Sequence, residues 1–334
     1  MLGGCDDPAE TYDDDYAPSD EKGDINGADD RIDRYKVEVD DPRYELARSS
    51  ALLTLVKNLS TSASGGWELK LDDEKGRHRT LGEVAGLCEG ERFAEQPFAG
   101  GGSCSGTLIA PDLMLTAGHC FSDAERVAPS APVVQKACDD TKVVFDFAYD
   151  AEGDTPSWFP ENDVYQCKKV LARELHRELL LGKIIDYAII KLDRDVEGRS
   201  PVPLRGGSPM DADAPVTQVG HPYAIPQKLA DGVVLGGVAC GDTHYDSDVL
   251  AGNSGSGLFD VRTRTVAGVF ARSSGRNYTL DRDRGCNVIA VCGENVSCPA
   301  PVQALGVPEI LSRLSPDVLE LLSILEVGGP SRCR

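Results

Sequence analysis

Basic residues are scarce in this chain of 334 residues, which has 34 Lys and Arg against 55 Asp and Glu and a net charge of -21. No basic stripe is present that could displace counterions from a phosphate backbone, so the composition excludes a nucleic-acid-binding protein. No apolar run reaches the length of a membrane-spanning helix, and no long helical heptad pattern occurs. The remaining composition is globular, with 41% hydrophobic residues and many turn formers, 35 Gly and 20 Pro.

Metal-binding patterns are also absent. The five histidines are dispersed without HxxxH spacing, and the cysteines form no paired CxxC motifs of the kind that bind structural zinc. We therefore expect no metal and no cofactor. The 11 cysteines are numerous for a reducing cytosol and favour disulfides in an oxidising compartment. Their number is odd, so one cysteine is left over.

Cys5 is the natural candidate for that cysteine, because Leu2-Gly3-Gly4-Cys5 resembles a bacterial lipoprotein cleavage site, where the cysteine is acylated. Only Met1 precedes it, without a charged or apolar leader, so either the start is truncated or the match is fortuitous. The first 42 residues hold 15 Asp and Glu against 4 Lys and Arg. Such a composition buries too little apolar surface to order itself. We predict an acidic, largely disordered tail or tether over residues 1–45.

Short strand-like segments bounded by turn signals dominate the rest of the chain. The clearest of them are residues 104–109, 113–117 and 187–192. Residues 173–182 fit a helix or a strand equally well. The segment 308–326 opens with a Pro-Glu start signal and has a further one at Ser315-Pro316-Asp317, after which apolar residues recur at helical spacing. The pattern predicts a mainly antiparallel β fold that ends in one helix.

Ser254 lies in a glycine-rich turn, Gly252-Asn253-Ser254-Gly255-Ser256-Gly257. Such a turn leaves the hydroxyl exposed and the backbone N–H groups free to face a substrate carbonyl oxygen, as a peptide hydrolase requires. An ordinary Gly/Ser loop is the alternative. The stretch is not a GxSxG elbow, because Ser256 stands at the fifth position.

Two further residues fit the same chemistry. His119 follows an apolar run and could act as a catalytic base or only close a strand. Asp186 is flanked by apolar residues, and a carboxylate there needs a hydrogen-bonding partner, which a histidine N–H would supply. The alternative is an aspartate that caps a turn. The order His119, Asp186, Ser254 is that of one of the folds that carry a Ser-His-Asp triad, which favours the catalytic interpretation of all three.

With these motifs the chain resembles the trypsin-like serine peptidases of the chymotrypsin fold, and more closely their bacterial glutamyl-endopeptidase-like members. The resemblance covers roughly residues 46–310. The residues that carry it are Cys104-Ser105-Gly106-Thr107-Leu108-Ile109, Thr116-Ala117-Gly118-His119-Cys120, Asp186-Tyr187-Ala188-Ile189-Ile190-Lys191-Leu192 and Gly252-Asn253-Ser254-Gly255-Ser256.

The resemblance implies an all-β fold of two six-stranded antiparallel β-barrels with a C-terminal helix. The implied units are residues 46–196 for the first barrel, 197–307 for the second, and 308–334 for the helix and tail. In this family, the cysteine in the strand before the histidine forms a disulfide with the cysteine that follows the histidine. The resemblance therefore implies a disulfide between Cys104 and Cys120.

A mechanism is implied as well. His119 would take the proton of Ser254 as the hydroxyl attacks a carbonyl carbon, while Asp186 would hold the imidazole in the right tautomer. The N–H groups of Gly252 and Ser254 would form the oxyanion hole, each contributing about 3 kcal/mol of transition-state stabilisation.

Several positions depart from the family pattern. Asn253 stands where trypsin-like zymogens have the aspartate that pairs with a new N-terminus, so we expect no activation by that ion pair. Asp248 stands six residues before Ser254, where an acid would select cationic side chains; alternatively it is only a polar loop residue. Phe270 stands where glutamyl-specific enzymes have a histidine, which argues against glutamate specificity.

The expected substrate-binding residues are Asp248, Val249, Phe270, Ala271, Arg272 and Ser273. Of these, Ala271 to Ser273 should pair with the substrate backbone, although Arg272 stands where an apolar wall is common. We expect a bacterial serine endopeptidase that acts on polypeptides as a monomer, secreted or in the cell envelope, and lipid-anchored if Cys5 is acylated. The alternatives are a catalytically idle homologue that binds peptides or proteins, and an esterase with the same acyl chemistry.

Overall fold

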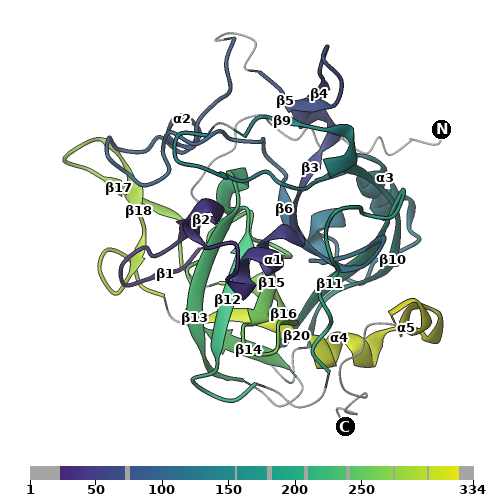
Figure 1. Cartoon of the computed structure of the whole chain (residues 1–334). Coiled ribbons are helices and arrows are strands. Elements are labelled where there is room, and N and C mark those ends of the chain that lie inside the picture. Colours follow the sequence, from purple (N-terminus) through teal and green to yellow (C-terminus); the bar gives the residue numbers. More distant parts are fainter. Residues whose placement is uncertain are drawn as a thin grey trace, which may run out of the picture.

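The computed structural model describes residues 23–71, 76–154, 156–178, 183–206, 210–237, 241–273, 275–298 and 301–322. Within these residues, the strands form two closed six-stranded antiparallel β-barrels that lie side by side (Figure 1). The predicted fold class is therefore confirmed. None of the helices in the described ranges is long and apolar enough to cross a membrane.

The first barrel closes in the strand order β10-β11-β7-β6-β3-β8. Its strands are β3 (Ser50–Leu55), β6 (Cys104–Ala110), β7 (Leu113–Thr116), β8 (Thr141–Val144), β10 (Val164–Glu178) and β11 (Lys183–Leu192). Every residue of β6 and β7 is buried, because one face points into the barrel and the other is covered by neighbouring structure. Residues 173–178 belong to β10, so this part of the segment 173–182, which fitted a helix or a strand equally well, is a strand.

The second barrel closes in the order β12-β15-β16-β20-β14-β13, and β13 pairs back with β12. Its strands are β12 (Pro215–Gly220), β13 (Lys228–Gly237), β14 (Asp242–Tyr245), β15 (Gly257–Asp260), β16 (Thr265–Arg272) and β20 (Val302–Gly306). One apolar cluster joins residues of both barrels, among them Leu115, Ile189, Val219 and Leu305. This shared core stabilises the two barrels against each other, which positions a site built from both.

The N-terminal region differs from the prediction of a largely disordered tail over residues 1–45. Residues 23–45 are ordered: β1 (Ile25–Asn26) pairs with β19 (Val291–Cys292), and β2 (Ile32–Asp33) pairs with β13 of the second barrel (Figure 1). Ile25 and Arg31 are buried, and Arg31 forms a two-pronged ion pair with Asp29. An acidic composition predicts a solvated segment, but the charges of Arg31 and Asp29 are paired with each other. Residues 1–22, including Cys5, lie outside the described residues.

The C-terminal segment forms two helices rather than the one predicted, α4 (Val307–Arg313) and α5 (Pro316–Leu322). The break has a local cause: Pro316 lacks an N–H and disfavours a helical conformation at Ser315. Residues 323–334 lie outside the described ranges. The remaining elements are α1 (Pro42–Arg48), α2 (Leu81–Ala85), α3 (Pro132–Asp139), β4 (Leu59–Thr61), β5 (Trp67–Leu69), β9 (Trp158–Phe159), β17 (Tyr278–Asp281), β18 (Cys286–Ile289) and β19 (Val291–Cys292).

Candidate active site

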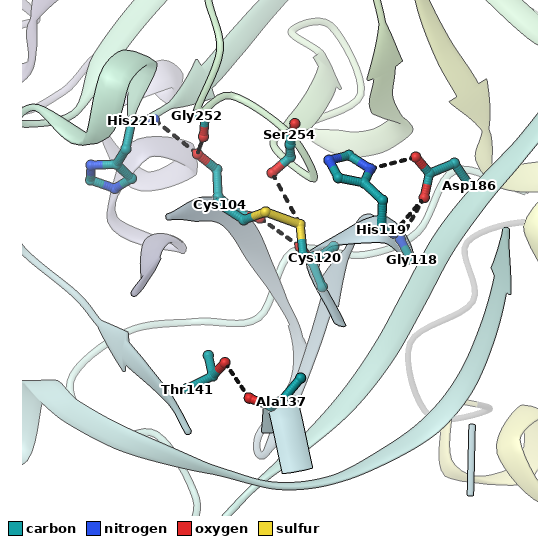
Figure 2. The surroundings of a disulfide bond; sticks show 12 residues. Cys104, Gly118, His119, Cys120, Ala137, Thr141, Asp186, His221, Gly252 and Ser254 are labelled. Carbon is teal, nitrogen blue, oxygen red and sulfur yellow. Dashed lines mark hydrogen bonds and ion pairs between the residues drawn. A yellow bond between two sulfur atoms is a disulfide. The ribbon is translucent and has the colours of Figure 1, made fainter. Parts of the chain in front are cut away.

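His119 and Asp186 lie next to each other on neighbouring strands of the first barrel. β7 ends at Thr116, just before the short 3-10 helix that begins at His119, and β11 carries Asp186. The antiparallel register that pairs Ala188 with Thr116 brings the two side chains to the same end of the strands. Nδ1 of His119 lies 2.6 Å from Oδ2 of Asp186 (Figure 2).

The carboxylate of Asp186 is buried but fully provided with hydrogen-bond donors. Its Oδ1 accepts the backbone N–H of Gly118 at 2.6 Å and that of His119 at 3.0 Å. A buried carboxylate without partners would be strongly destabilising, and these bonds compensate its loss of water. Because an ionised carboxylate only accepts hydrogen bonds, Nδ1 of His119 carries the proton, which leaves Nε2 as the acceptor in the neutral ring.

The charge of Asp186 also changes the acidity of His119. Burial lowers the pKa of the imidazole, but the Coulombic attraction and the hydrogen bond of Asp186 outweigh burial, so the pKa of His119 is raised above its usual value. A base with a raised pKa accepts a proton more readily. The pair can therefore abstract a proton from a neighbouring hydroxyl and hold it as an imidazolium.

Ser254 lies beside the imidazole of His119, on the side away from Asp186 (Figure 2). Ser254 is part-exposed. Its backbone carbonyl oxygen accepts the N–H of Ser105, which lies on β6 of the first barrel, at 2.8 Å. Within the described residues, no hydrogen bond joins the Ser254 hydroxyl to the His119 ring. In peptidases without substrate such contacts are often long and tighten only in the complex.

Two glycines shape the turn around Ser254. Gly252 and Gly255 both have left-handed backbone conformations, with φ of 86° and 82°. A Cβ at Gly252 would lie 2.6 Å from the carbonyl oxygen of His221, and one at Gly255 would meet Thr116 and Ser105. Only glycine tolerates both the conformation and the close approach. The turn therefore brings the backbone that carries Ser254 directly against the first barrel.

The backbone N–H groups of Gly252 and Ser254 are available to a ligand. In the part of the chain that the structure describes, neither donates to a protein acceptor, whereas the N–H groups of Asn253 and Gly255 are both bonded. Two unpaired donors in one turn match the requirements of an oxyanion hole. Ser105 supports this turn, because its hydroxyl donates to the Gly252 carbonyl oxygen at 2.8 Å.

Arg173 on β10 is a supporting residue that the sequence did not reveal. Its guanidinium donates to the carbonyl oxygen of Gly118 at 2.8 Å and to those of Ala124 and Val127 at 3.1 and 3.0 Å. Arg173 is buried. It therefore ties together the backbone on both sides of His119. A lone arginine in a charged, ambiguous segment gives no sequence signal for such a role, and neither does Ser105.

The structure places Asp248 and Val249 against the N-terminal segment. Oδ1 of Asp248 accepts the N–H of Asn26 at 2.8 Å, and Oδ2 accepts that of Asp30 at 3.0 Å. Val249 is fully buried and forms an isolated antiparallel bridge with Asp24. The part that these two residues play in substrate selection stays a prediction.

The other expected substrate-binding residues lie on or just after β16. Phe270 is buried in the core cluster of the second barrel, together with Val249. The guanidinium of Arg272 is paired with Asp242 at 3.1 Å and also donates to Gln303. Ser273 is buried, and its hydroxyl has no hydrogen-bond partner in the described ranges. Ala271 belongs to the same strand. None of these contacts tests the predicted role in binding substrate.

Asn253, which precedes Ser254, is also buried. Its Oδ1 has no hydrogen-bond partner among the residues that the structure describes. Asn253 is uncharged and thus offers no anion for a new N-terminus. That the chain lacks activation by an ion pair stays a prediction.

Disulfides join the eight cysteines of the described ranges. One links Cys104 to Cys120, the pair that the family resemblance implies, and it flanks His119 (Figure 2). The other three are Cys88–Cys286, Cys138–Cys167 and Cys292–Cys298. Cys5, Cys240 and Cys333 lie outside the described residues. Cys104, His119 and Cys120 are close enough to share a metal ion, but both sulfurs are committed to the disulfide and unavailable as thiolates.

Known proteins of similar structure include peptidases. A Glu endopeptidase in complex with MPD is 15% identical, with a TM-score of 0.44 over 90% of this chain and 98% of the other. A serine endoprotease from Yersinia pestis is 13% identical, with a TM-score of 0.40 over 86% of this chain and 67% of the other. A comparison with curated proteins found no match.

A comparison with family models matches a central part of the chain. Residues 104–269 match the model of the trypsin-like peptidase domain. The matched range includes His119, Asp186 and Ser254, and it takes in strands of both barrels. The chain therefore belongs to the trypsin-like peptidase family.

Proposed function

We propose that the chain is a serine endopeptidase that hydrolyses peptide bonds through Ser254, His119 and Asp186. The observation that carries the proposal is the hydrogen-bonded pair of His119 and Asp186, with Ser254 on the other side of the ring (Figure 2).

Acylation proceeds in this proposal as follows. Nε2 of His119 takes the hydroxyl proton while Oγ of Ser254 bonds to the substrate carbonyl carbon, and Asp186 stabilises the resulting imidazolium. The oxyanion accepts hydrogen bonds from the N–H groups of Gly252 and Ser254. The imidazolium then gives its proton to the leaving amine as the C–N bond breaks. Water attacks the acyl-enzyme by the same route, releases the acid and restores the hydroxyl.

One observation favours a second candidate, a catalytically idle homologue that binds peptides or proteins. The described residues contain no hydrogen bond between Ser254 and His119, and an inactive relative would not need one. An idle homologue would keep the two-barrel fold and a peptide-binding surface, but it would release no products.

A mixture of peptides with varied sequences tests the proposal. Incubation with the full chain should yield cleaved products by mass spectrometry, and Ser254→Ala should abolish them. Ser64→Ala is the matched control, because this hydroxyl lies in an exposed turn, where it shares a hydrogen bond with the hydroxyl of Ser62. An intact peptide mixture that binds to folded protein would support the idle homologue. Cleavage of esters without peptides would indicate an esterase.

We also infer that the protein acts in an oxidising compartment, secreted or in the cell envelope, as a monomer on polypeptide substrates. The four disulfides of the described residues support this location, because such bonds are rare in a reducing cytosol. Acylation of Cys5 stays a prediction, and mass spectrometry of the natural protein would test it.

A further inference from the structure

The N-terminal segment of residues 23–33, here called the strap, is bonded to the loop that carries Ser254. The N–H of Asp24 donates to the carbonyl oxygen of Val249 at 2.8 Å, and the N–H of Val249 donates back at 2.9 Å. Val249 belongs to residues 246–254, here called the nucleophile loop. The strap is therefore paired with this loop along its backbone, just before the catalytic turn.

The side chain of Asp24 connects the strap to a second segment. Asp24 is only 1% exposed, and its Oδ1 accepts the N–H of Gly275 at 2.6 Å. Gly275 follows β16, the strand that carries Phe270 and Arg272. Next to Asp24, β1 pairs with Val291 and Cys292 of β19. The strap thus bridges the nucleophile loop and the chain that follows β16.

Asp248 provides another connection between the strap and the nucleophile loop. Both of its carboxylate oxygens accept backbone N–H groups of the strap, from Asn26 and from Asp30. Asp248 is 2% exposed, so these bonds replace the water that its carboxylate lost on burial. Asn26 adds a bond from its side chain to the carbonyl oxygen of Asp246 at 3.1 Å. An acid that could have faced substrate is thus committed to the strap.

The far end of the strap is fixed to the second barrel. β2 pairs with Lys228 and Leu229 of β13, so the strap extends the barrel sheet by one short strand (Figure 1). The ammonium of Lys228 is buried and lies 2.7 Å from both Asp33 and the side-chain oxygen of Gln96. A segment anchored at both ends can hold a loop in place, whereas a loosely attached tail cannot.

Two features of the nucleophile loop around Ser254 call for such support. Gly252 has a left-handed conformation, and the two N–H groups of the oxyanion turn donate to no protein acceptor in the described ranges. Asn253 supplies no charge for an ion pair. We propose that the strap positions the nucleophile loop, with Asp24 and Asp248 as its positioning residues; the catalytic part of this inference rests on the proposed peptidase function.

Asp24→Ala in the full chain tests the proposal, with two measurements below the unfolding temperature. The variant removes the acceptor of the Gly275 N–H, and with it one of the bonds that fix the strap. The strap should then hold the nucleophile loop less firmly, so amide hydrogen exchange in residues 246–254 should become about tenfold faster, and peptide hydrolysis should slow about tenfold in kcat. Asp24→Asn keeps an acceptor for Gly275 and should restore most of both. The matched control is Asp40→Ala, an exposed acid just beyond the strap.

Unchanged exchange in residues 246–254 and unchanged kcat in folded Asp24→Ala protein would overturn the proposal. A lower unfolding temperature without either effect would show a merely structural role, and would overturn it too. Should Asp24→Ala fail to fold, the same measurements are made on Asp248→Asn, which keeps the volume and removes one acceptor. Exchange does not depend on turnover, so faster exchange in a chain without peptidase activity would support the strap and contradict only the proposed function.

Discussion

Asp186 holds His119 at two points. Its Oδ2 lies 2.6 Å from Nδ1 of the ring, and its Oδ1 accepts the backbone N–H of His119 at 3.0 Å. One carboxylate thereby fixes the orientation of the ring and the position of the main chain that carries it. Arg173 supports the same loop from the other side through the carbonyl oxygen of Gly118. The imidazole therefore presents Nε2 in a defined direction, toward Ser254.

Replacing the acid by its amide should separate these roles. Asp186→Asn keeps the size of the side chain but removes the charge, so the imidazole loses its tautomer preference and the imidazolium its stabilising partner. We expect kcat for peptide hydrolysis to fall by about 10³- to 10⁴-fold, with a smaller change in KM. Asp140→Asn is the control, since that acid forms an exposed ion pair with Lys136 at the end of α3. Equal activity of Asp186→Asn and the unchanged chain would exclude the proposed role.

The raised pKa of His119 determines the pH dependence of hydrolysis. Only the neutral imidazole accepts the Ser254 proton, so kcat/KM should fall as the pH drops through the pKa of His119, with a midpoint above the usual 6.5. The same raised pKa affects the stability of the fold in the opposite direction along the pH scale. A raised histidine pKa stabilises the fold fully below the unfolded value, and this contribution is lost as the pH rises through the folded value. A kcat/KM profile with a midpoint below 6.5 would contradict the assigned pairing.

Local signals were sufficient to find the three residues of the candidate site. A glycine-rich turn, an acid between apolar residues and a histidine after a buried run each depend on a few neighbours along the chain. The two-barrel fold followed from the family resemblance that these motifs carry. The contacts of Ser105 and Arg173 with this site depend on which strands become neighbours, and no pattern near either residue records that.

The N-terminal region shows the limit of composition most clearly. Fifteen acids in the first 42 residues predict a solvated tail, yet Asp24 and Asp33 are buried. Their partners, Gly275 and Lys228, lie 251 and 195 residues further along the chain, so nothing local indicates the pairing. The break between α4 and α5 was different: a start signal at Ser315-Pro316-Asp317 marked it in the sequence, but the whole segment 308–326 was interpreted as one helix.

The carboxyl groups of Asp30 in the strap and Asp248 in the nucleophile loop should make stability depend on pH. Burial, together with the charges of Asp30 and Asp29, raises the pKa of Asp248 to about 7. Burial and the charges of Asp231 and Asp29 also raise the pKa of Asp30, while the hydrogen bond to Asp248 and the charge of Arg92 oppose the rise.

Because the folded pair binds a proton that the unfolded chain releases, the free energy of unfolding should decrease as the pH rises from about 4 to about 7. Asp30→Asn removes one charge and should reduce this decrease, whereas Asp40→Asn should leave it unchanged. Denaturant unfolding at about pH 5 and about pH 8 measures the effect. The same decrease in Asp30→Asn as in the unchanged chain would contradict the assignment.

The cleavage preference tests whether Asp248 faces substrate. Both of its oxygens accept strap N–H groups, so we expect no selection for Lys or Arg before the scissile bond. Asp248→Asn should lower hydrolysis of all peptides to a similar extent. A cleavage profile from a peptide library gives the answer. If the unchanged chain prefers Lys or Arg and Asp248→Asn loses only that preference, Asp248 belongs to the specificity pocket.

Reaction with a fluorophosphonate tests the central claim most directly, because the reagent is attacked by a serine that a neighbouring base activates. The full chain should form a covalent adduct, which peptide mapping should locate on Ser254. Ser254→Ala should form none, and His119→Ala should react far more slowly. Folded protein that stays unlabelled, or an adduct that persists in Ser254→Ala, would contradict an activated Ser254.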